Sequence, residues 1–361
     1  MSDTLASRGY RMPADWERHE ATMLTWPHIP AGERQHPHWP GLFGQIPAIW
    51  ARMVKELEIG EDVHILIHDD ATETSARAEM KSAGVRGERV HLHRIPNDFA
   101  WARDHGPIVV KNAAGERLLL DWKYNAWGNQ WDWERDDRIP SLLAADLGQR
   151  SIKIPMVLEG GSIDVNGQGT LLTTEGCLLN PNRNPDLTKE QIEQRLKDYL
   201  GLTKILWLGD GIAGDDTSGH VDDLARFVGP RTIVTIINED PQDPDYSPLQ
   251  ENLRRLRAMT DQDGQSLEIL TITQPKPVLI DRAPTKGGHT PGKGFRIPAS
   301  YANFYIANEC VLLPVWDDPR DAEAVAVLQQ CFPGRRIVPI DSRVLTWGWG
   351  SFHCVTQQIP A

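Results

Sequence analysis

A recurring pattern of β-hairpin, helix and strand constrains the fold of this chain more than any other feature. Turn residues between apolar runs predict three hairpins, at residues 159–179, 219–237 and 300–316. Apolar residues at helical spacing follow each hairpin and predict helices over 186–201, 246–260 and 319–334. A short apolar strand follows each helix, in the sequences TKILWLG, LEILTIT and RRIVPID.

The N-terminal part of the chain contains two further copies, which begin at ATMLTWPH and at GPIVVKNAAGERLLLDW. Five copies predict modules that bury a core by packing on their neighbours and close as a ring, within a single domain over 1–361. The alternative is a mixed α/β sheet whose hairpins resemble one another by accident. The sequence FHCVTQQIP could supply the strand that the first copy lacks, beside ATMLTWPH.

The charge balance argues against two classes of partner. The chain has 38 Lys and Arg against 50 Asp and Glu, a net charge of −12. Such a chain is poorly suited to nucleic acid or an anionic membrane, and it favours a cationic ligand, although ordinary acidic proteins share this balance. The four cysteines form no CxxC motif, and we find neither a signal-peptide pattern nor a run of about 18 apolar residues. These features predict a cytoplasmic protein without a metal centre, and they leave a homo-oligomer open.

Cys354 is the candidate nucleophile. Gly350 lies shortly before it and allows close approach of a ligand. In a strand, neighbouring side chains point to opposite faces, so His353 is not expected to be the base for Cys354. The alternative role for Cys354 is a small buried hydrophobic residue.

Three other segments carry candidate polar residues. His220 and Asp222 would share one face of a strand and suit an acid/base group beside a cation site, unless they belong to a solvated hairpin edge. Glu159 occupies the place in its module that His220 occupies in the next. In PNDFAWARDHGP, Asp98 precedes an aromatic stretch and is the stronger ligand candidate.

The remaining charges of that segment, Arg103 and Asp104, are expected to form a structural ion pair. In a ring, Asp98, Glu159, His220 and Cys354 would converge on the centre. Several carboxylates suit a guanidinium, which has many N–H donors, and a thiolate suits covalent attack on its carbon.

With these residues in place, the chain resembles the agmatine deiminase and Porphyromonas-type peptidyl-arginine deiminase family. The likeness extends over nearly the whole chain, through MPADWERHEATMLTWPH, NDFAWARDHGP, DWKYNAWG, LEGGSIDVNGQGTLLTTEGCLLNPNRNP, TSGHVDDLARFV, SYANFYIAN and HCVTQQIP. It implies the pentein fold, a five-bladed α/β propeller of ββαβ modules around a central active site.

The resemblance also implies an activity: hydrolysis of agmatine to N-carbamoylputrescine and ammonia, a step towards putrescine and the polyamines, without a cofactor. It implies Cys354 as nucleophile, His220 as general acid/base and Asp98 and Asp222 as guanidinium-binding carboxylates. Glu159 resembles the carboxylate that orients the histidine. The resemblance further places three residues at the substrate, namely Trp101, Gly350 and Ser351.

Three positions depart from the family pattern and leave the substrate's far end open. Trp349 and Ser351 replace a glycine and an asparagine of GGGNIHC, and His105 stands where Thr or Tyr is common. A tryptophan near the mouth would narrow the channel or stack on a different substrate. The Gly-rich segment 284–298 is a candidate lid loop, or an ordinary surface loop.

The sequence is also consistent with rival functions. Free arginine or a peptidyl arginine would replace agmatine, giving citrulline, if Arg8, Arg11 or Arg296 met a substrate carboxylate. An amidinotransferase or another thiol hydrolase would use the same scaffold. A guanidine-binding protein with an inert thiol is the non-enzymatic alternative.

Overall fold

The strands of this protein form several small sheets rather than one large one. The computed structural model describes residues 4–30, 32–281 and 292–361. Within these residues there are five sheets of three or four strands and one two-stranded ribbon, and no sheet closes on itself. The architecture is therefore mixed α/β.

The five larger sheets share one plan, in which a strand pairs antiparallel with one neighbour and parallel with the other. In spatial order their strands are β18 (Thr356–Pro360), β1 (His19–Thr25), β2 (Asp62–Ile67) and β3 (Val90–Arg94); β4 (Ile108–Lys111), β5 (Arg117–Lys123) and β6 (Ser151–Val157); β7 (Ile163–Val165), β8 (Thr170–Thr174) and β9 (Lys204–Leu208); β10 (Ala225–Phe227), β11 (Thr232–Ile237) and β12 (Glu268–Thr273); β15 (Tyr305–Ile306), β16 (Cys310–Val315) and β17 (Arg336–Asp341). The predicted sequence of hairpin, helix and strand is confirmed in the modules that suggested it.

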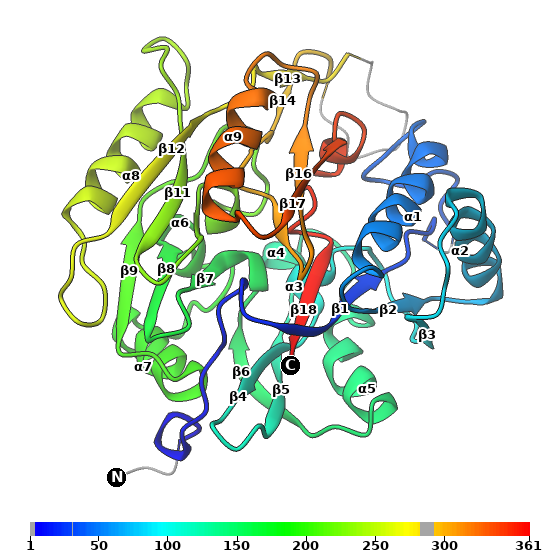
Figure 1. Cartoon of the computed structure of the whole chain (residues 1–361), viewed down its shortest axis with the longest axis horizontal. Helices are drawn as coiled ribbons and strands as arrows, with labels where there is room; N and C mark the ends of the chain where they lie inside the picture. Colours follow the sequence, from blue (N-terminus) through cyan, green and yellow to red (C-terminus); the bar gives the residue numbers. More distant parts are fainter. Residues whose placement is uncertain (1–3, 31, 282–291) are drawn as a thin grey trace.

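A helix lies within each parallel crossover, as a parallel connection requires. These helices are α1 (Ile46–Leu57), α2 (Asp70–Ala83), α5 (Ile139–Asp146), α7 (Lys189–Leu200), α8 (Tyr246–Ala258) and α9 (Asp321–Cys331). The other helices are three single turns, α3 (Ala102–His105), α4 (Ala126–Asn129) and α6 (Glu175–Leu178); β13 (Val278–Leu279) and β14 (Arg296–Ile297) form the ribbon. In Figure 1, α1, α2, α5, α7 and α8 lie at the outside of the molecule and α3 and α4 lie near its middle.

Helix α7 illustrates how the sequence sets these elements. Thr188 and Gln191 form a capping box at its start, which satisfies amide groups that the helix leaves unpaired. Gly201 ends it with φ 69°, a conformation that glycine adopts readily, as predicted. Ile192, Leu196 and Leu200 are buried on one face, so packing and capping both hold the helix in place.

The C-terminal strand completes the first sheet, as predicted. β18 pairs antiparallel with β1, with Gln357 opposite Met23. The strand begins only at Thr356, however, and the Thr356 hydroxyl donates to the Phe352 carbonyl (2.7 Å) in a tight turn. Cys354 therefore lies in that turn and not in a strand, so strand alternation does not govern His353 and Cys354.

Glu159 and His220 occupy equivalent places, as predicted. Each directly precedes a one-turn 3₁₀ segment, Gly160–Ser162 or Val221–Asp223, which leads into the first strand of its hairpin. The expected strand at His220 and Asp222 is wrong, because the turn occupies these positions and the strand begins at Ala225. The turn nevertheless brings both side chains to one side, beside Gly161.

None of the helices in the described ranges is both long enough and apolar enough to cross a bilayer.

Candidate active site

The turn that carries Cys354 is held by close packing and by one amide. A β-carbon added at Gly350 would lie 2.9 Å from Cys354 Sγ and 2.8 Å from the Trp101 ring, so only glycine fits there. Asn303 Oδ1 accepts from the Ser351 and His353 amides (3.1 Å each), and Asn303 Nδ2 donates to Cys354 Sγ (3.0 Å). Asn303 thus fixes both the turn and the thiol.

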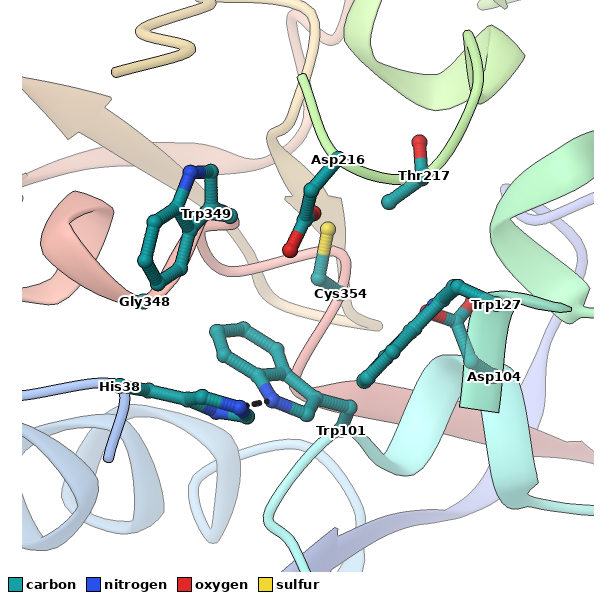
Figure 2. A pocket seen from close by; sticks show the side chains of 9 residues that line it. All are labelled: His38, Trp101, Asp104, Trp127, Asp216, Thr217, Gly348, Trp349 and Cys354. Atoms are coloured by element: carbon teal, nitrogen blue, oxygen red, sulfur yellow. Dashed lines mark hydrogen bonds between the residues drawn. The ribbon is translucent and has the colours of Figure 1, made fainter. Parts of the chain in front are cut away.

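The thiol faces a narrow cavity, here called the inner cavity. Figure 2 shows the thiol in the middle, with indole rings and carboxylates around it. The lining residues are His38, Trp101, Asp104, Trp127, Asp216, Thr217, Gly348, Trp349 and Cys354. Trp101 lines this cavity and donates its Nε1–H to His38 (2.9 Å), whereas its role toward a substrate stays a prediction.

Asp104, and not Asp98, supplies the carboxylate that the segment NDFAWARDHGP brings to the cavity. Asp104 accepts from Trp127 Nε1 (2.9 Å) and from the Gly161 amide (3.0 Å), and its Oδ1 lies 3.8 Å from His220 Nδ1. Asp98 instead accepts from Arg135 (2.7 Å), and it is not among the described residues that line the inner cavity. The structure therefore places Asp98 in an ion pair outside this cavity.

The expected Arg103–Asp104 ion pair is also absent from the described contacts. The Arg103 amide donates to the Cys354 carbonyl (3.0 Å), and Arg103 Nε donates to the His353 carbonyl (3.3 Å). Arg103 thus holds the turn that carries Cys354 through two hydrogen bonds. Asp104, the residue that follows it, forms no described ion pair with Arg103 and faces the inner cavity.

Asp222 lies on the other side of the thiol. Its Oδ2 is 3.6 Å from Cys354 Sγ and 2.7 Å from His353 Nδ1, whereas its Oδ1 meets no hydrogen-bond partner among the described residues. His353 Nε2 lies 3.1 Å from Asp15, which also accepts from Arg226 (2.6 Å). A buried chain of polar groups therefore holds Asp222 and leaves one of its oxygens unpaired.

His220 is fully enclosed, and within the described residues neither of its ring nitrogens has a hydrogen-bond partner. Ligand atoms of His220, Glu159 and Cys177 lie within 4.8 Å of one another. Glu159 accepts from Arg183 Nε (2.6 Å), and its second oxygen is unpaired in the same described region. Glu159 thus lies near the histidine, and its role in orienting that ring stays a prediction.

The site is strongly polarised. Burial raises the pKa of Cys354 well above its usual value, and the charges of Asp222, Asp223 and Asp104 raise it further. Burial also raises the pKa of Asp104 to about 6, although His220 opposes the shift. Burial alone would lower the pKa of His220, but Asp104, Cys177 and Glu159 outweigh it and the pKa rises well above its usual value. These shifts favour a protonated Cys354 thiol and a protonated His220 imidazole.

Residues 11–360 match the family described as Porphyromonas-type peptidyl-arginine deiminase. The chain belongs to this family. It is 38% identical to a relative from Latilactobacillus sakei, over 98% of this chain and 96% of that one, and 35% identical to the agmatine deiminase of Ectopseudomonas mendocina, over 100% and 98%. The solved agmatine deiminase of Enterococcus faecalis superposes with a TM-score of 0.90 at 34% identity, over 100% of this chain and 98% of that one.

A class of proteins with far lower sequence identity shares the fold of this peptidyl-arginine deiminase family member. The amidinotransferase SxtG of Microseira wollei has a TM-score of 0.51 at 12% identity, covering 97% of this chain and 96% of that one. At this identity the likeness concerns the fold alone. It agrees with the mixed α/β architecture described above.

Two of the family-pattern departures lie away from the thiol's cavity. The hydroxyls of Ser351 and Ser342 are 2.6 Å apart, so the Ser351 side chain is turned to the protein interior and only its amide serves the site. His105 is buried with its Nε2 3.4 Å from the Thr25 hydroxyl, and burial lowers its pKa to about 3. The expected substrate contact of Ser351 is thus not supported by the geometry.

A second, more open space, here called the outer hollow, adjoins the inner cavity of the family member. It is lined by Gln130, Trp131, Gly214, Asp215, Asp216, Phe295 and Trp349. Trp349 and Asp216 belong to both spaces. The lining holds two acidic side chains and no arginine or lysine among the described residues. Burial and the neighbouring Asp215 raise the pKa of Asp216 well above its usual value, and a bound cation would favour its charged form, so the hollow suits a cation.

The three arginines considered for a substrate carboxylate are engaged elsewhere. Arg11 pairs with Glu17 (2.6 Å), Arg296 pairs with Asp243 (2.7 Å), and Arg8 lies over the Tyr10 ring. Residues 284–291 of the candidate lid at 284–298 lie outside the described residues.

Two groups of side chains bring together atoms of the kinds that bind metal ions. They are Glu159, Cys177 and His220, and Asp222, Asp223 and Cys354. Both groups overlap the thiol, histidine and carboxylate set described above, and the prediction that no metal is needed stays a prediction.

The sequence reasoning missed four contributors to the site: Asp104, Trp127, Asn303 and Asp216. Three of them lie in motifs that identified the family, NDFAWARDHGP, DWKYNAWG and SYANFYIAN. The signal was therefore present, but the motifs alone do not say which of their side chains face the cavity.

Proposed function

We propose that this protein is an agmatine deiminase, a hydrolase of C–N bonds in linear amidines that converts agmatine and water to N-carbamoylputrescine and ammonia. The observation that carries the proposal is the meeting of four buried groups: Asp222 lies 3.6 Å from Cys354 Sγ, Asp104 lies 3.8 Å from His220 Nδ1, and both carboxylates and the histidine surround Gly161. An outer hollow lined by Asp215 and Asp216 adjoins them. Agmatine is cationic at both ends, with a guanidinium at one and an ammonium at the other. The agmatine deiminases among the relatives support the same assignment.

The guanidinium would lie between Asp104 and Asp222. Each carboxylate is buried, and the unpaired Oδ1 of Asp222 and Oε2 of Glu159 are ready acceptors for its N–H groups. Charge-assisted hydrogen bonds in a buried site are stronger than neutral ones. The ammonium at the far end would be attracted by Asp215 and Asp216 in the outer hollow.

Binding of the cation would also prepare the nucleophile. The carboxylates that raise the pKa of Cys354 would be neutralised by the bound guanidinium, and its positive charge would favour the thiolate. The thiol would then release its proton to water. Substrate binding thus activates the thiol without a dedicated base.

In the first half-reaction the Cys354 thiolate adds to the guanidinium carbon. Protonated His220 donates a proton to the departing nitrogen, the C–N bond breaks and ammonia leaves. An S-alkylthiouronium remains on Cys354. Glu159 and Asp104, close to His220, favour the protonated form that this step needs.

In the second half-reaction neutral His220 takes a proton from water, and the hydroxide adds to the same carbon. The C–S bond breaks, and the proton of the new hydroxyl group returns to sulfur. The ureido product leaves, with the thiol and the protonated histidine restored.

The five sheets of one plan fit a five-bladed propeller, with the chain as a single catalytic domain. In this arrangement Glu159 and His220, each at the start of its module, would face a common centre together with Cys354.

The test is a ureido-product assay with agmatine, free arginine and a peptide ending in arginine, run in parallel. Saturable turnover of agmatine that is lost in Cys354→Ala is expected. Turnover of arginine or the peptide in preference to agmatine would keep the chemistry and refute the substrate. An inactive protein whose Cys354 also resists alkylation by a haloacetamidine would refute the enzyme.

A further inference from the structure

Trp349 has a backbone conformation that favours glycine. Its φ is 69° and its ψ is 21°, in the left-handed region that residues with a β-carbon seldom adopt. Such a conformation persists only where the surrounding structure holds it, and such positions cluster at functional sites.

The two neighbouring glycines hold this backbone in place. A β-carbon added at Gly348 would lie 2.7 Å from the Trp39 indole, and one added at Gly350 would lie 2.9 Å from Cys354 Sγ. The backbone therefore passes between Trp39 and the nucleophile candidate with no spare room. The Trp349 side chain consequently leaves the chain at a fixed point close to the thiol.

The indole of Trp349 lies between the inner cavity and the outer hollow. It lines both spaces and is only 7% exposed. Figure 2 shows it at the inner cavity, near Asp216. The His38 ring meets it edge-to-face, with centroids 6.3 Å apart and planes at 86°. His38 also accepts the Trp101 Nε1–H, so the ring that contacts the Trp349 indole is itself held by a hydrogen bond.

We propose that Trp349 makes this site selective for guanidines on an unbranched alkyl chain. The inference rests on the proposed function. A substrate whose guanidinium reaches Cys354 and whose far end enters the outer hollow must run its chain past the indole. Methylene groups can lie against a flat ring, whereas a branch on the chain would collide with it.

The test separates the branch from its charge. Agmatine, argininamide and free arginine share the guanidinium and the chain; argininamide adds a neutral branch, and arginine adds a carboxylate. In Trp349→Gly the ratio of kcat/KM for agmatine to that for argininamide should fall at least about tenfold, the usual scale of steric discrimination. Arginine should gain less, because its carboxylate would enter a hollow lined by the acidic side chains of Asp215 and Asp216 and by no arginine or lysine among the described residues.

Trp349→Phe keeps an aromatic ring of smaller size and should shift the ratio in the same direction by less. It also preserves the test if the glycine variant fails to fold. Asp317→Gly is the matched control, because Asp317 is another left-handed residue (φ 59°), exposed and not among the residues lining either space. It should leave the ratio unchanged.

An agmatine-to-argininamide ratio that stays within twofold of the wild type in both Trp349 variants would overturn the inference. An equal shift in Asp317→Gly would also overturn it, because the effect would then come from general loosening. A wild-type protein that turns over none of the three compounds would instead refute the proposed function.

Discussion

Gly161 should tolerate no side chain, because three functional groups surround it. A β-carbon added there would lie 2.6 Å from His220 Nδ1, 2.9 Å from Asp104 Oδ1 and 3.0 Å from Asp222 Oδ2. The first contact is about 0.8 Å short of ordinary van der Waals distance, so the groups must move. A misplacement of about 1 Å costs roughly 10²-fold in rate, while overpacking costs about 1–3 kcal/mol of stability. Gly161→Ala should therefore lose about 10²-fold in kcat/KM and remain folded.

Two measurements check this prediction: kcat/KM for agmatine and the free energy of unfolding in urea. Gly44→Ala is the control, because a β-carbon there meets nothing within 4 Å, and it should retain wild-type activity. If folded Gly161→Ala stays within threefold of wild type, then His220, Asp104 and Asp222 do not form the reacting constellation.

Three further predictions concern the carboxylates. Asp104→Asn should lower kcat/KM by about 10²-fold or more, because a buried charge-assisted contact is lost. Asp98→Asn should stay within about threefold of the wild type. Equal losses of kcat/KM in steady-state assays would contradict the assignment of Asp104, and not Asp98, to the active site. Because the pKa of Asp104 is raised to about 6, its carboxylate is protonated as the pH falls through 6, and kcat/KM should fall over the same range. A profile of kcat/KM that is flat from pH 5 to 8 would exclude the Asp104 carboxylate as a group that binds the substrate. His353→Gln should raise KM for agmatine about tenfold with a smaller change in kcat, because Asp222 loses an orienting partner. An effect on kcat alone would contradict a role of His353 in positioning Asp222.

Local sequence signals predicted the modules well because each signal acts over a few residues. The apolar face of 186–201 and the cap at Gly201 depend on neighbours within one or two helical turns. The pairing of the C-terminal strand with the first module was also predictable, because the repeat itself showed which strand was lacking. The strand expected at His220 failed for a local reason too, since a 3₁₀ turn precedes the short strand that begins at Ala225.

The direction of side chains in loops depends on partners that are distant in sequence. Asn303 holds the turn at Cys354 from 51 residues away, and no periodicity relates the two segments. The same holds for Asp15, which reaches His353 across 338 residues. Such contacts can be seen only when the modules are assembled, so a motif marks the segment without marking the side chain that acts.

The sequence favoured Asp98 where the structure places Asp104, because loop side chains take their direction from partners that are distant in sequence. Both lie in one loop rich in charge and aromatic rings, where sequence gives no preferred direction for either carboxylate. The backbone amides of Asp98 and Phe99 are taken by Asp136 (2.7 and 3.2 Å), and Arg135 draws the Asp98 carboxylate outward. Helix α3 then turns the chain, and Trp127, from the β5–β6 connection, and Gly161, from the next module, aim Asp104 at the cavity. An aspartate beside an arginine in sequence suggests an ion pair, but a folded chain offers its carboxylate to whichever donors the other modules bring.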